Sequence, residues 1–360
     1  MGSKKREEVD NNTLIESTVV SDEIMVSVFC LAYNHERFIR KTLDGFIMQR
    51  TSFPFEVLIH DDASTDKTAE VIREYEEKYP DIIKPVYQKE NQYSKPGHPN
   101  IIATHLFPRA KGKYFAWCEG DDYWIDPFKL QRQIDIMESH PECSACLSKV
   151  ERITYEGKPK GEFIPVFNKE DGVIHGKDFV NYVLDPAPMN VFPIQISGLV
   201  AQKTVYCEYC NKLPSFVNCS PVGDIPLALY LGMKGDIYYI HDVMSHYRTG
   251  NPYSFIGRTH SKREKSAQHY ERKAIFYESF DQYTNYEYHE HAEKAVAYCK
   301  YSAALKRRDY KQIRAKESRW LYRALPMKKK TSQFVVHYFP WAEEPLKKMI
   351  YFSKKVHRFI

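Results

Sequence analysis

The chain has 360 residues, of which 43% are apolar and 14% aromatic, and its 52 Lys and Arg against 47 Asp and Glu give a formal net charge of +5. This composition excludes a disordered or fibrous chain, and the length suits one large domain with an extension, or two domains. No run of 18 apolar residues is present and residues 1–24 are polar, so the sequence predicts neither a transmembrane helix nor a signal peptide.

Apolar runs and helical periodicity alternate along the first 140 residues. Apolar runs are typical of strands buried on both faces of a parallel sheet, and a three-to-four-residue apolar spacing is typical of amphipathic helices. Strands are expected at 25–32, 55–60, 82–87 and 113–118, and helices at 38–47, 67–79, 101–110 and 128–139. This order predicts an α/β fold with a doubly wound, mostly parallel sheet.

The second half of the chain is less regular. Strands are expected at 143–153, 196–201 and 235–240, a helix opened by an acidic residue at 223–231, and a helical region from 262 onward. The stretch 155–195 contains several prolines and is expected to be a loop-rich segment. We therefore expect a polar leader at 1–24, a main domain at 25–255 and a basic helical region at 256–360.

Polar residues follow three of the predicted strands, at the edge where ligands bind in such sheets. Tyr33 follows the first strand, Asp61-Asp62 the second, and Glu119-Gly-Asp121-Asp122 the fourth. Three carboxylates within four residues repel one another unless a cation is present, and Mg²⁺ or Mn²⁺ with substrate phosphates is their natural occupant. A solvated acidic turn is the alternative for such a motif, and turn capping is the alternative for Asp61-Asp62.

Glycine-rich phosphate loops are absent from the sequence. No GxGxxG follows the first strand and no GxxxxGK[ST] occurs, which disfavours dinucleotide-binding and P-loop enzymes. A diphosphate would then be held by a cation and by side chains. Asp62 is placed to accept a hydrogen bond from a base N–H, and Tyr33 to stack on that base.

Four segments, at 26–43, 56–68, 109–133 and 222–231, resemble in order and spacing the motifs of glycosyltransferase family 2. Its members are inverting sugar transferases with the GT-A fold, and EGDDYW followed by DPFKLQ is the most specific match. The resemblance covers about residues 25–255 and is to the bacterial surface-polysaccharide type. It implies a GT-A catalytic domain there and a C-terminal helical extension.

The resemblance also implies roles for individual residues. Tyr33 and Asp62 would contact the nucleotide base. Glu119 stands first in the DXD-type motif, and Asp121 and Asp122 would bind the Mn²⁺ or Mg²⁺ that bridges the diphosphate. Arg248, in the segment 246–248, would close over the diphosphate.

Asp224 stands where such enzymes place the catalytic base. Inverting transfer needs one base to take the proton of the acceptor hydroxyl on the face opposite the leaving diphosphate. The cation and Arg248 would stabilise the charge that develops on the diphosphate. The alternative for Asp224 is helix N-capping alone, since an acid favours a helix start.

Other residues leave two interpretations open. Trp124 either walls the sugar or acceptor pocket or packs in the core, and His60 is interpreted as a core or turn residue. The pairs Cys143–Cys146 and Cys207–Cys210 have metal-ligand spacing, but the segment around Cys143 also reads as a buried strand.

The positive charge is concentrated at the end of the chain. Residues 301–360 hold 16 Lys and Arg against four acidic residues, whereas the preceding 300 residues hold 36 basic and 43 acidic residues. Residues 341–360 have the pattern of an interfacial amphipathic helix, which indicates an anionic membrane surface, although its apolar face also suits packing on the catalytic domain. Nucleic-acid binding through this region and a sugar nucleotidyltransferase are the competing functions.

The acidic body disfavours the nucleic-acid alternative, because an edge lined with carboxylates would repel phosphates when no metal is bound. The sequence therefore predicts a cytoplasmic enzyme, peripheral at the inner face of the cell membrane and without a nucleic-acid partner. Its expected partners are a nucleotide-sugar donor, most simply a UDP-sugar, and a glycan or lipid-linked acceptor.

Overall fold

The computed structural model describes residues 23–95, 100–167, 170–185, 193–252 and 262–313, with parts of 254–259 and 315–339. The predicted leader, except for its last two residues, and the predicted amphipathic helix at 341–360 lie outside these residues. Both therefore stay predictions. Among the described residues, no helix is both long enough and apolar enough to cross a membrane.

A mixed sheet forms the centre of the described structure, in the order β3-β2-β1-β4-β9-β6-β10-β5, with β7 on β6 and β8 on β10. Its strands are β1 Val26–Ala32, β2 Phe55–Asp61, β3 Ile83–Tyr87, β4 Tyr114–Trp117, β5 Tyr123–Trp124, β6 Cys143–Ile153, β7 Pro159–Ile164, β8 Gly172–Ile174, β9 Leu199–Gln202 and β10 Asp236–Arg248. The strands β3, β2, β1 and β4 run parallel to one another, and β6 runs parallel to β10. Between these two groups, β9 is antiparallel to both β4 and β6. The predicted doubly wound, mostly parallel sheet is confirmed.

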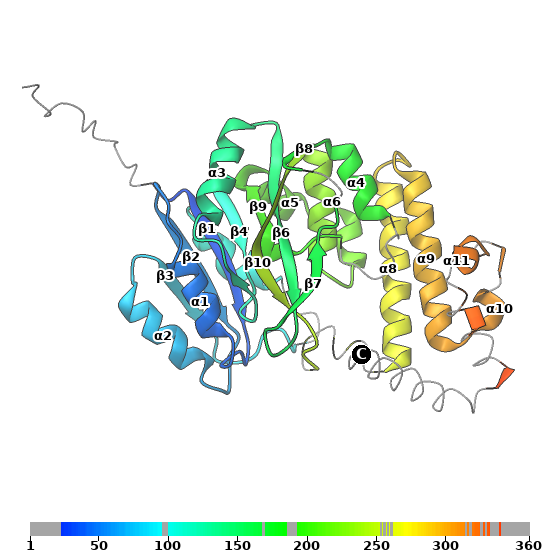
Figure 1. The fold of residues 1–360 in the computed structure, drawn as a ribbon, viewed down its shortest axis with the longest axis horizontal. Coiled ribbons are helices and arrows are strands. Elements are labelled where there is room, and N and C mark those ends of the chain that lie inside the picture. The colour runs from blue at the N-terminus through cyan, green and yellow to red at the C-terminus, as the bar shows by residue number, and fades with distance from the viewer. Residues whose placement is uncertain are drawn as a thin grey trace, which may run out of the picture.

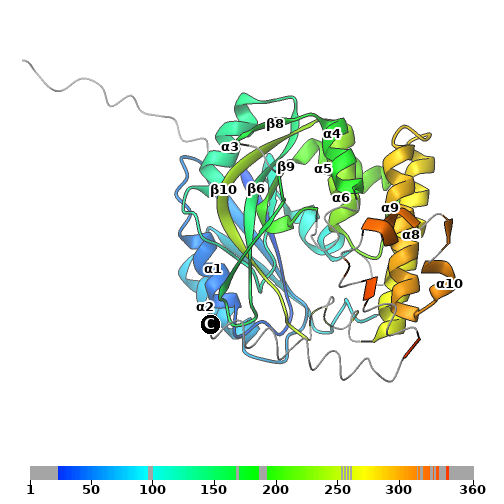
Figure 2. The same ribbon diagram turned by 45° about the vertical axis from the view of Figure 1, so that its right-hand side comes forward.

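Helices cover both faces of this sheet (Figures 1 and 2). They are α1 Ile39–Ile47, α2 Thr68–Lys78, α3 Lys129–Ser139, α4 Gly176–Leu184, α5 Lys203–Lys212, α6 Asp224–Lys234, α8 Arg263–Tyr283, α9 His289–Arg307, α10 Tyr310–Ile313 and α11 Arg319–Ala324. The apolar faces of α1, α2 and α3 share one buried cluster with the sheet, and those of α4, α5 and α6 share another. Two separate apolar layers thus hold the strand ends in fixed positions.

Two parts of the sequence fold differently from the prediction. The stretch 155–195 is not only loop, because it contains β7, β8 and α4, whose Phe179, Val180, Val183 and Leu184 are buried at helical spacing. The helix expected at 101–110 is a π-helical turn, Ile102–Leu106, followed by a 3₁₀ turn, Phe107–Arg109. Pro108 lacks the N–H that a continuous α-helix needs there.

The C-terminal helices α8 and α9 lie side by side at the opposite end of the molecule from α1 and α2 (Figures 1 and 2). Their apolar residues belong to the same buried cluster as α4, α5 and α6, among them Ala274, Phe276, Tyr277 and Phe280. Arg307 of α9 also pairs with Glu264 and Glu271 of α8. The helices α8 and α9 are therefore packed on the same core as α4, α5 and α6 rather than separate from it, while Ile313 of α10 and Leu321 of α11 join a smaller cluster with α9.

Phe216 anchors α8 to the short helix Ser215–Cys219 that leads toward α6. It is 0% exposed, and its ring centroid lies 5.2 Å from that of Phe280 and 5.1 Å from that of Tyr283. We expect Phe216→Ala to lower the free energy of unfolding by about 3–5 kcal/mol, because it removes buried area and leaves a cavity. Denaturant unfolding measures this change.

The matched control for that substitution is Phe128→Ala, at a ring that is 46% exposed. It should change stability by less than about 1 kcal/mol, as substitutions at exposed sites usually do. Equal unfolding midpoints for Phe216→Ala and the wild type would mean that α8 is not anchored through this ring.

Candidate active site

Two loops that follow β1 and β2 are tied to each other. The backbone N–H of Asn34 donates to Ser64 Oγ at 3.0 Å, and Asn34 Oδ1 accepts the N–H of Thr65 at 2.8 Å. Asn34 and Ala63 hold φ angles of +55° and +58°, a left-handed conformation that non-glycine residues adopt only where surrounding structure enforces it. The carboxyl ends of β1 and β2 thus form one preorganised platform.

The residues predicted to contact a base lie on this platform. Tyr33 is 42% exposed, so its ring is accessible for stacking. Asp62 instead accepts the backbone N–H groups of Gln92 at 2.7 Å and Tyr93 at 3.0 Å, which fixes the segment after β3. Asp62 is 5% exposed and therefore has a structural task in the described chain.

Asp61, the last residue of β2, is 2% exposed and differs from Asp62 in its hydrogen bonding. Its Oδ1 is buried and has no hydrogen-bond partner among the described residues, while its other oxygen receives the N–H of Ser64 at 3.4 Å. Burial raises the pKa of this carboxyl. The sequence placed both aspartates at the strand end but could not show which one accepts the hydrogen bonds of the loop after β3.

His60, next to Asp61, is a core residue, as expected. It is 1% exposed, and its ring centroid lies 5.1 Å from that of His105. Burial lowers the pKa of His60 to about 4, so the ring is neutral at physiological pH.

The turn that carries Glu119, Asp121 and Asp122 is held by α1 and β1. Thr42 Oγ1 donates to the carbonyl oxygens of Gly120 at 3.1 Å and Asp122 at 2.6 Å, and the N–H of Gly120 donates to Leu31 O at 2.9 Å. A Cβ at position 120 would lie 2.8 Å from His35 Nδ1 and 3.1 Å from Leu31 O, so any other residue there would have to displace its neighbours.

Asp122 is the most constrained carboxylate of the turn. It is 2% exposed, and its two oxygens accept the Arg248 backbone N–H at 2.8 Å and Gln195 Nε2 at 3.0 Å. Burial, followed by the nearby charge of Asp121, raises the pKa of Asp122. These bonds join the turn to β10, so the geometry favours a structural role for Asp122 over the predicted metal contact.

Glu119 and Asp121 carry the crowded negative charge of the site. Burial first, then the charges of Asp121 and Asp224, raise the pKa of Glu119 to about 8. No hydrogen bond to the Asp121 carboxylate occurs within the described residues, and this residue is only partly buried. Asp121 is therefore the carboxylate of the turn that remains available to a ligand.

The residues present fit a divalent cation that is completed by substrate. The described residues contain no group of three or more His, Cys, Asp or Glu side chains able to enclose a metal ion. Mg²⁺ usually takes one or two protein carboxylates and fills its other positions with phosphate oxygens and water. Asp121, with Glu119 beside it, matches that pattern, and a bound cation would offset the burial and the neighbouring charges of Asp121 and Asp224 that raise the pKa of Glu119.

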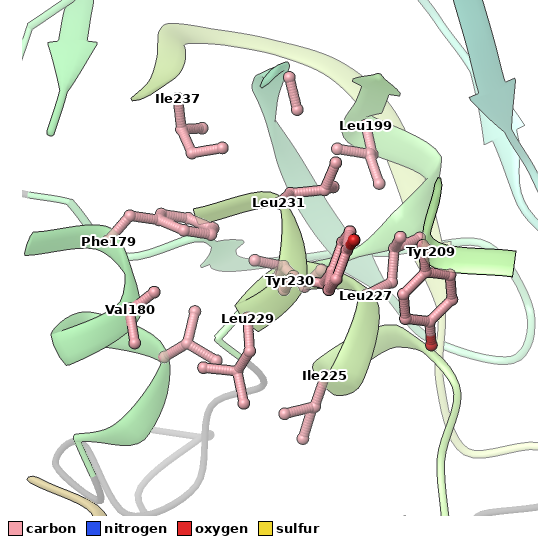
Figure 3. Close-up of a cluster of buried hydrophobic side chains, with 14 of the residues drawn as sticks. Phe179, Val180, Leu199, Tyr209, Ile225, Leu227, Leu229, Tyr230, Leu231 and Ile237 are labelled. Atoms are coloured by element: carbon pink, nitrogen blue, oxygen red, sulfur yellow. The ribbon is translucent and has the colours of Figure 1, made fainter. Parts of the chain in front are cut away.

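Asp224 opens α6 toward the same edge. α6 is apolar on nearly every side and is enclosed by α4, α5 and the sheet, as Ile225, Leu229 and Tyr230 show in Figure 3. A helix buried in this way holds its first residue in a fixed place. Asp224 Oδ1 accepts the N–H of Ile225 at 2.9 Å, and its charge acts on Glu119 and Tyr247, so the two acidic segments are neighbours.

Burial is the main influence on the protonation of Asp224. It raises the pKa of this carboxyl, while the Ile225 N–H and the Lys273 charge act in the opposite direction. The carboxyl is partly exposed. A carboxylate with a raised pKa at the rim of a site is suited to accept a proton near neutral pH.

The Arg248 side chain binds the Asp121 turn to the loop at Tyr155. Its Nε donates to Asp121 O at 3.0 Å and one terminal nitrogen donates to Tyr155 O at 2.7 Å, while the guanidinium lies 4.3 Å from the Phe38 ring centroid. Arg248 is 7% exposed. In this arrangement the guanidinium braces the Asp121 turn, and its predicted contact with a diphosphate stays a prediction.

Burial and position in the fold decide between the two interpretations of Trp124 and of the cysteine pairs. Trp124 is 1% exposed, donates from its indole nitrogen to Ser197 O at 3.0 Å and packs on Phe46, so it belongs to the core. Cys143 and Cys146 are buried in β6, while Cys207 and Cys210 lie on α5. The zinc alternative has no support in the part of the chain that the structure describes.

Comparison with known proteins matches residues 27–172 to the family described as Glycosyl transferase family 2. An uncharacterized protein of Mycobacterium tuberculosis is 38% identical over 181 residues, covering 47% of this chain and 51% of that protein. TuaG of Bacillus subtilis, a putative teichuronic acid biosynthesis glycosyltransferase, is 30% identical over 141 residues, covering 39% and 52%. The chain therefore spans about half the length of these curated relatives.

The fold also has a counterpart among solved structures. Staphylococcus aureus TarS, residues 1–349 in complex with UDP-GlcNAc, superposes with a TM-score of 0.55 over 87% of this chain and 79% of that chain. Since the two chains are 15% identical, the likeness concerns the fold. The predicted GT-A-type fold is confirmed, and the superposed part extends well beyond the family match at 27–172.

Proposed function

Residues 27–172 belong to glycosyltransferase family 2, and from this membership and the geometry of the site we propose that the protein is an inverting glycosyltransferase. It moves a sugar from a nucleotide-sugar donor, most simply a UDP-sugar, to a hydroxyl group of a glycan or lipid-linked saccharide. The setting is the assembly of a surface polysaccharide, by analogy with the activity for which TuaG is named.

One observation supports this function above all. Groups suited to a base, a metal–diphosphate and a proton acceptor meet at a single edge of the sheet, although they come from distant parts of the chain. Tyr33 follows β1, Asp61 ends β2, Asp121 follows β4, and Asp224, whose charge acts on Glu119, begins α6. In open α/β sheets this edge is where ligands bind.

On the donor side, the protein binds and orients the nucleotide sugar. Tyr33 stacks on the base, and the unpartnered Oδ1 of Asp61 accepts a base N–H. Asp121 and Glu119 hold Mn²⁺ or Mg²⁺, which supplies positive charge to the departing diphosphate when it is bound. Asp122, Thr42 and Arg248 keep the turn that carries these carboxylates in place.

On the acceptor side, Asp224 accepts the proton. The acceptor oxygen forms a bond to the anomeric carbon as the bond from that carbon to the diphosphate oxygen breaks. The electron pair leaves with the diphosphate, and the hydroxyl proton passes to the Asp224 carboxylate. A single displacement from the opposite face inverts the anomeric configuration.

Release of nucleoside diphosphate from a panel of sugar nucleotides tests this function. In the presence of a mixed glycan acceptor and Mn²⁺ or Mg²⁺, we expect one donor to be turned over well above its spontaneous hydrolysis, and a chelator to abolish that turnover. If no sugar nucleotide in the panel were turned over with either metal, the proposed function would be contradicted.

The same assay separates the two competing functions. A sugar nucleotidyltransferase would release pyrophosphate from a nucleoside triphosphate and a sugar phosphate, with no need for a saccharide acceptor.

Association with an anionic membrane through residues 341–360 remains part of the proposal, and sedimentation with vesicles that contain phosphatidylglycerol tests it independently of catalysis.

A further inference from the structure

A polar pocket of about 370 Å³, the hairpin pocket, lies where β6, β7 and the end of β10 meet. Its lining includes Arg152 of β6, Tyr155 and Glu156 of the β6–β7 hairpin, Lys160 of β7 and Thr249 after β10. The volume is within the roughly 300–1,000 Å³ of small-ligand sites. None of these side chains has a task in donor binding or proton transfer, and their polarity suits a ligand rich in hydroxyl and charged groups.

The hairpin pocket lies at the same edge of the sheet as the candidate active site. β4 and β6 are both antiparallel to β9, so they run in the same direction, and β10 is parallel to β6. β1 and β2 share that direction, since β1 is parallel to both β2 and β4. The carboxyl ends of β6 and β10, which border the pocket, therefore lie at the edge where ligands bind in open α/β sheets.

Arg248 connects the wall of the hairpin pocket to the turn that carries Asp121. Its Nε donates to Asp121 O at 3.0 Å, and its Nη1 donates to Tyr155 O at 2.7 Å. One guanidinium group therefore separates the pocket wall from the turn. A ligand in the pocket would lie beside the candidate diphosphate site without occupying it.

The β6–β7 hairpin gives the pocket a preorganised wall. The N–H of Thr154 donates to Lys158 O at 2.8 Å, and the N–H of Gly157 donates to Thr154 O at 2.9 Å. Gly157 has a φ angle of +88°, which a residue with a side chain rarely adopts. The Tyr155 ring packs edge-on against Phe38, with 5.3 Å between ring centroids, so α1 supports the hairpin.

The two cations that line the pocket have unused hydrogen-bonding capacity. Arg152 Nη1 pairs with Glu162 at 2.8 Å, but Arg152 Nε has no partner among the described residues. Lys160 Nζ lies 3.5 Å from Thr249 Oγ1 and 3.7 Å from Glu162 Oε2, longer than the roughly 2.7–3.2 Å of an ordinary N–H···O bond. A ligand carboxylate or phosphate would supply closer acceptors, and such charge-assisted bonds are about twice as strong as neutral ones.

Positive charge exceeds negative charge around the pocket. Glu156 is exposed on the hairpin turn, and Glu162 is shared by the two cations of the lining. Next to the pocket, Arg37 donates to the hydroxyl of Tyr155 at 3.3 Å and Arg248 donates to its carbonyl. These four cations outnumber the two acids, so the local field favours an anionic ligand.

We propose that the hairpin pocket is an acceptor subsite, in which Arg152 and Lys160 bind the carboxylate or phosphate group of an anionic saccharide. This inference rests on the proposed function and specifies the chemical class of the acceptor. The donor uses the ends of β1, β2 and β4, whereas the acceptor uses the ends of β6 and β10. The two substrates would then meet beside Arg248, which contacts both the Asp121 turn and the pocket wall.

The test is a titration of the full chain, saturated with UDP and Mg²⁺, with glucuronic acid, glucose 6-phosphate and glucose, followed by ligand-observed NMR. Saturation with UDP keeps the probes out of the donor site. We expect at least one of the two anionic sugars to bind about tenfold more tightly than glucose, the usual effect of a hydrogen bond to a charged group. The tighter of the two shows whether the pocket prefers a carboxylate or a phosphate.

Three variants locate the binding site of the anionic sugar. Lys160→Gln and Arg152→Gln should each weaken its binding by about tenfold and leave the binding of glucose unchanged. Lys158→Gln is the matched control, because Lys158 is exposed on the same hairpin but does not line the pocket. Lys160 is also exposed, so Lys160→Gln should fold even if Arg152→Gln, which loses the pair with Glu162, does not.

Equal affinities for glucose and the anionic sugars would overturn the proposal, as would wild-type affinity in Lys160→Gln or no binding once UDP is bound. If the wild type bound an anionic sugar in the pocket but turned over no sugar nucleotide, the proposed function would be contradicted, while the site for an anionic saccharide would be supported.

Discussion

Replacing Asp224 by Asn is expected to lower kcat for sugar transfer by about 10²–10⁴-fold, because general base catalysis contributes about that much. Asn keeps the size of the side chain and an oxygen that can accept the Ile225 N–H, now at 2.9 Å from Asp224 Oδ1. α6 should therefore remain folded, and nucleotide affinity should remain within about twofold of the wild type, far below the catalytic effect. Steady-state release of nucleoside diphosphate measures the first quantity, and calorimetric titration with UDP and Mn²⁺ measures the second.

The matched control is Asp178→Asn. Asp178 is an exposed acid in the first turn of α4, so it lies in the first turn of a helix, as Asp224 does, but outside the site. Asp178→Asn should retain wild-type turnover. If Asp224 served only to favour the start of its helix, Asp224→Asn would behave like Asp178→Asn, and the catalytic role would be wrong.

Replacing Asp121 by Asn is expected to abolish metal-dependent nucleotide binding. Asp121 is the carboxylate of the turn with no hydrogen bond from the described residues, and an amide oxygen is a much weaker ligand for Mg²⁺ or Mn²⁺ than a carboxylate. Turnover should fall by at least about a hundredfold, the usual effect of removing a group that stabilises transition-state charge. Titration of UDP in the presence and absence of Mn²⁺ should then give the same weak affinity.

Two further variants test whether the loss of metal-dependent binding is specific to Asp121. Asp122→Asn should act mainly on stability, by about 1–3 kcal/mol, because its buried oxygens serve Gln195 and the Arg248 backbone rather than a ligand. Asp135→Asn, at an exposed position on α3, should change neither quantity. Retained Mn²⁺-dependent binding in Asp121→Asn, together with its loss in Asp122→Asn, would reverse the assignment of these two residues.

The sequence was most informative where burial is complete. The strand at 143–153 was predicted with the bounds of β6, because its apolar run has no competing helical spacing. The helix α4 was missed, since prolines on both sides favoured a loop although Phe179, Val180 and Val183 repeat at helical spacing. Local turn signals therefore outweighed a short apolar pattern that only tertiary packing makes decisive.

Within the site, the sequence identified the acidic groups but not how the chain uses them. Asp61 and Asp62 are adjacent and chemically alike, and only the contacts of Asp62 with the backbone at 92 and 93 set them apart. The same holds for Asp121 and Asp122, of which the second is bound to β10.

The most direct test of the central claim is a crystal structure of the full chain with UDP and Mn²⁺, with the metal located by its anomalous scattering. We expect an anomalous peak beside the Asp121 carboxylate, the base stacked on Tyr33 with an N–H directed to Asp61, and the diphosphate on the side of the turn that faces Asp224. A nucleotide bound elsewhere, or Mn²⁺ at a position remote from Asp121, would contradict it.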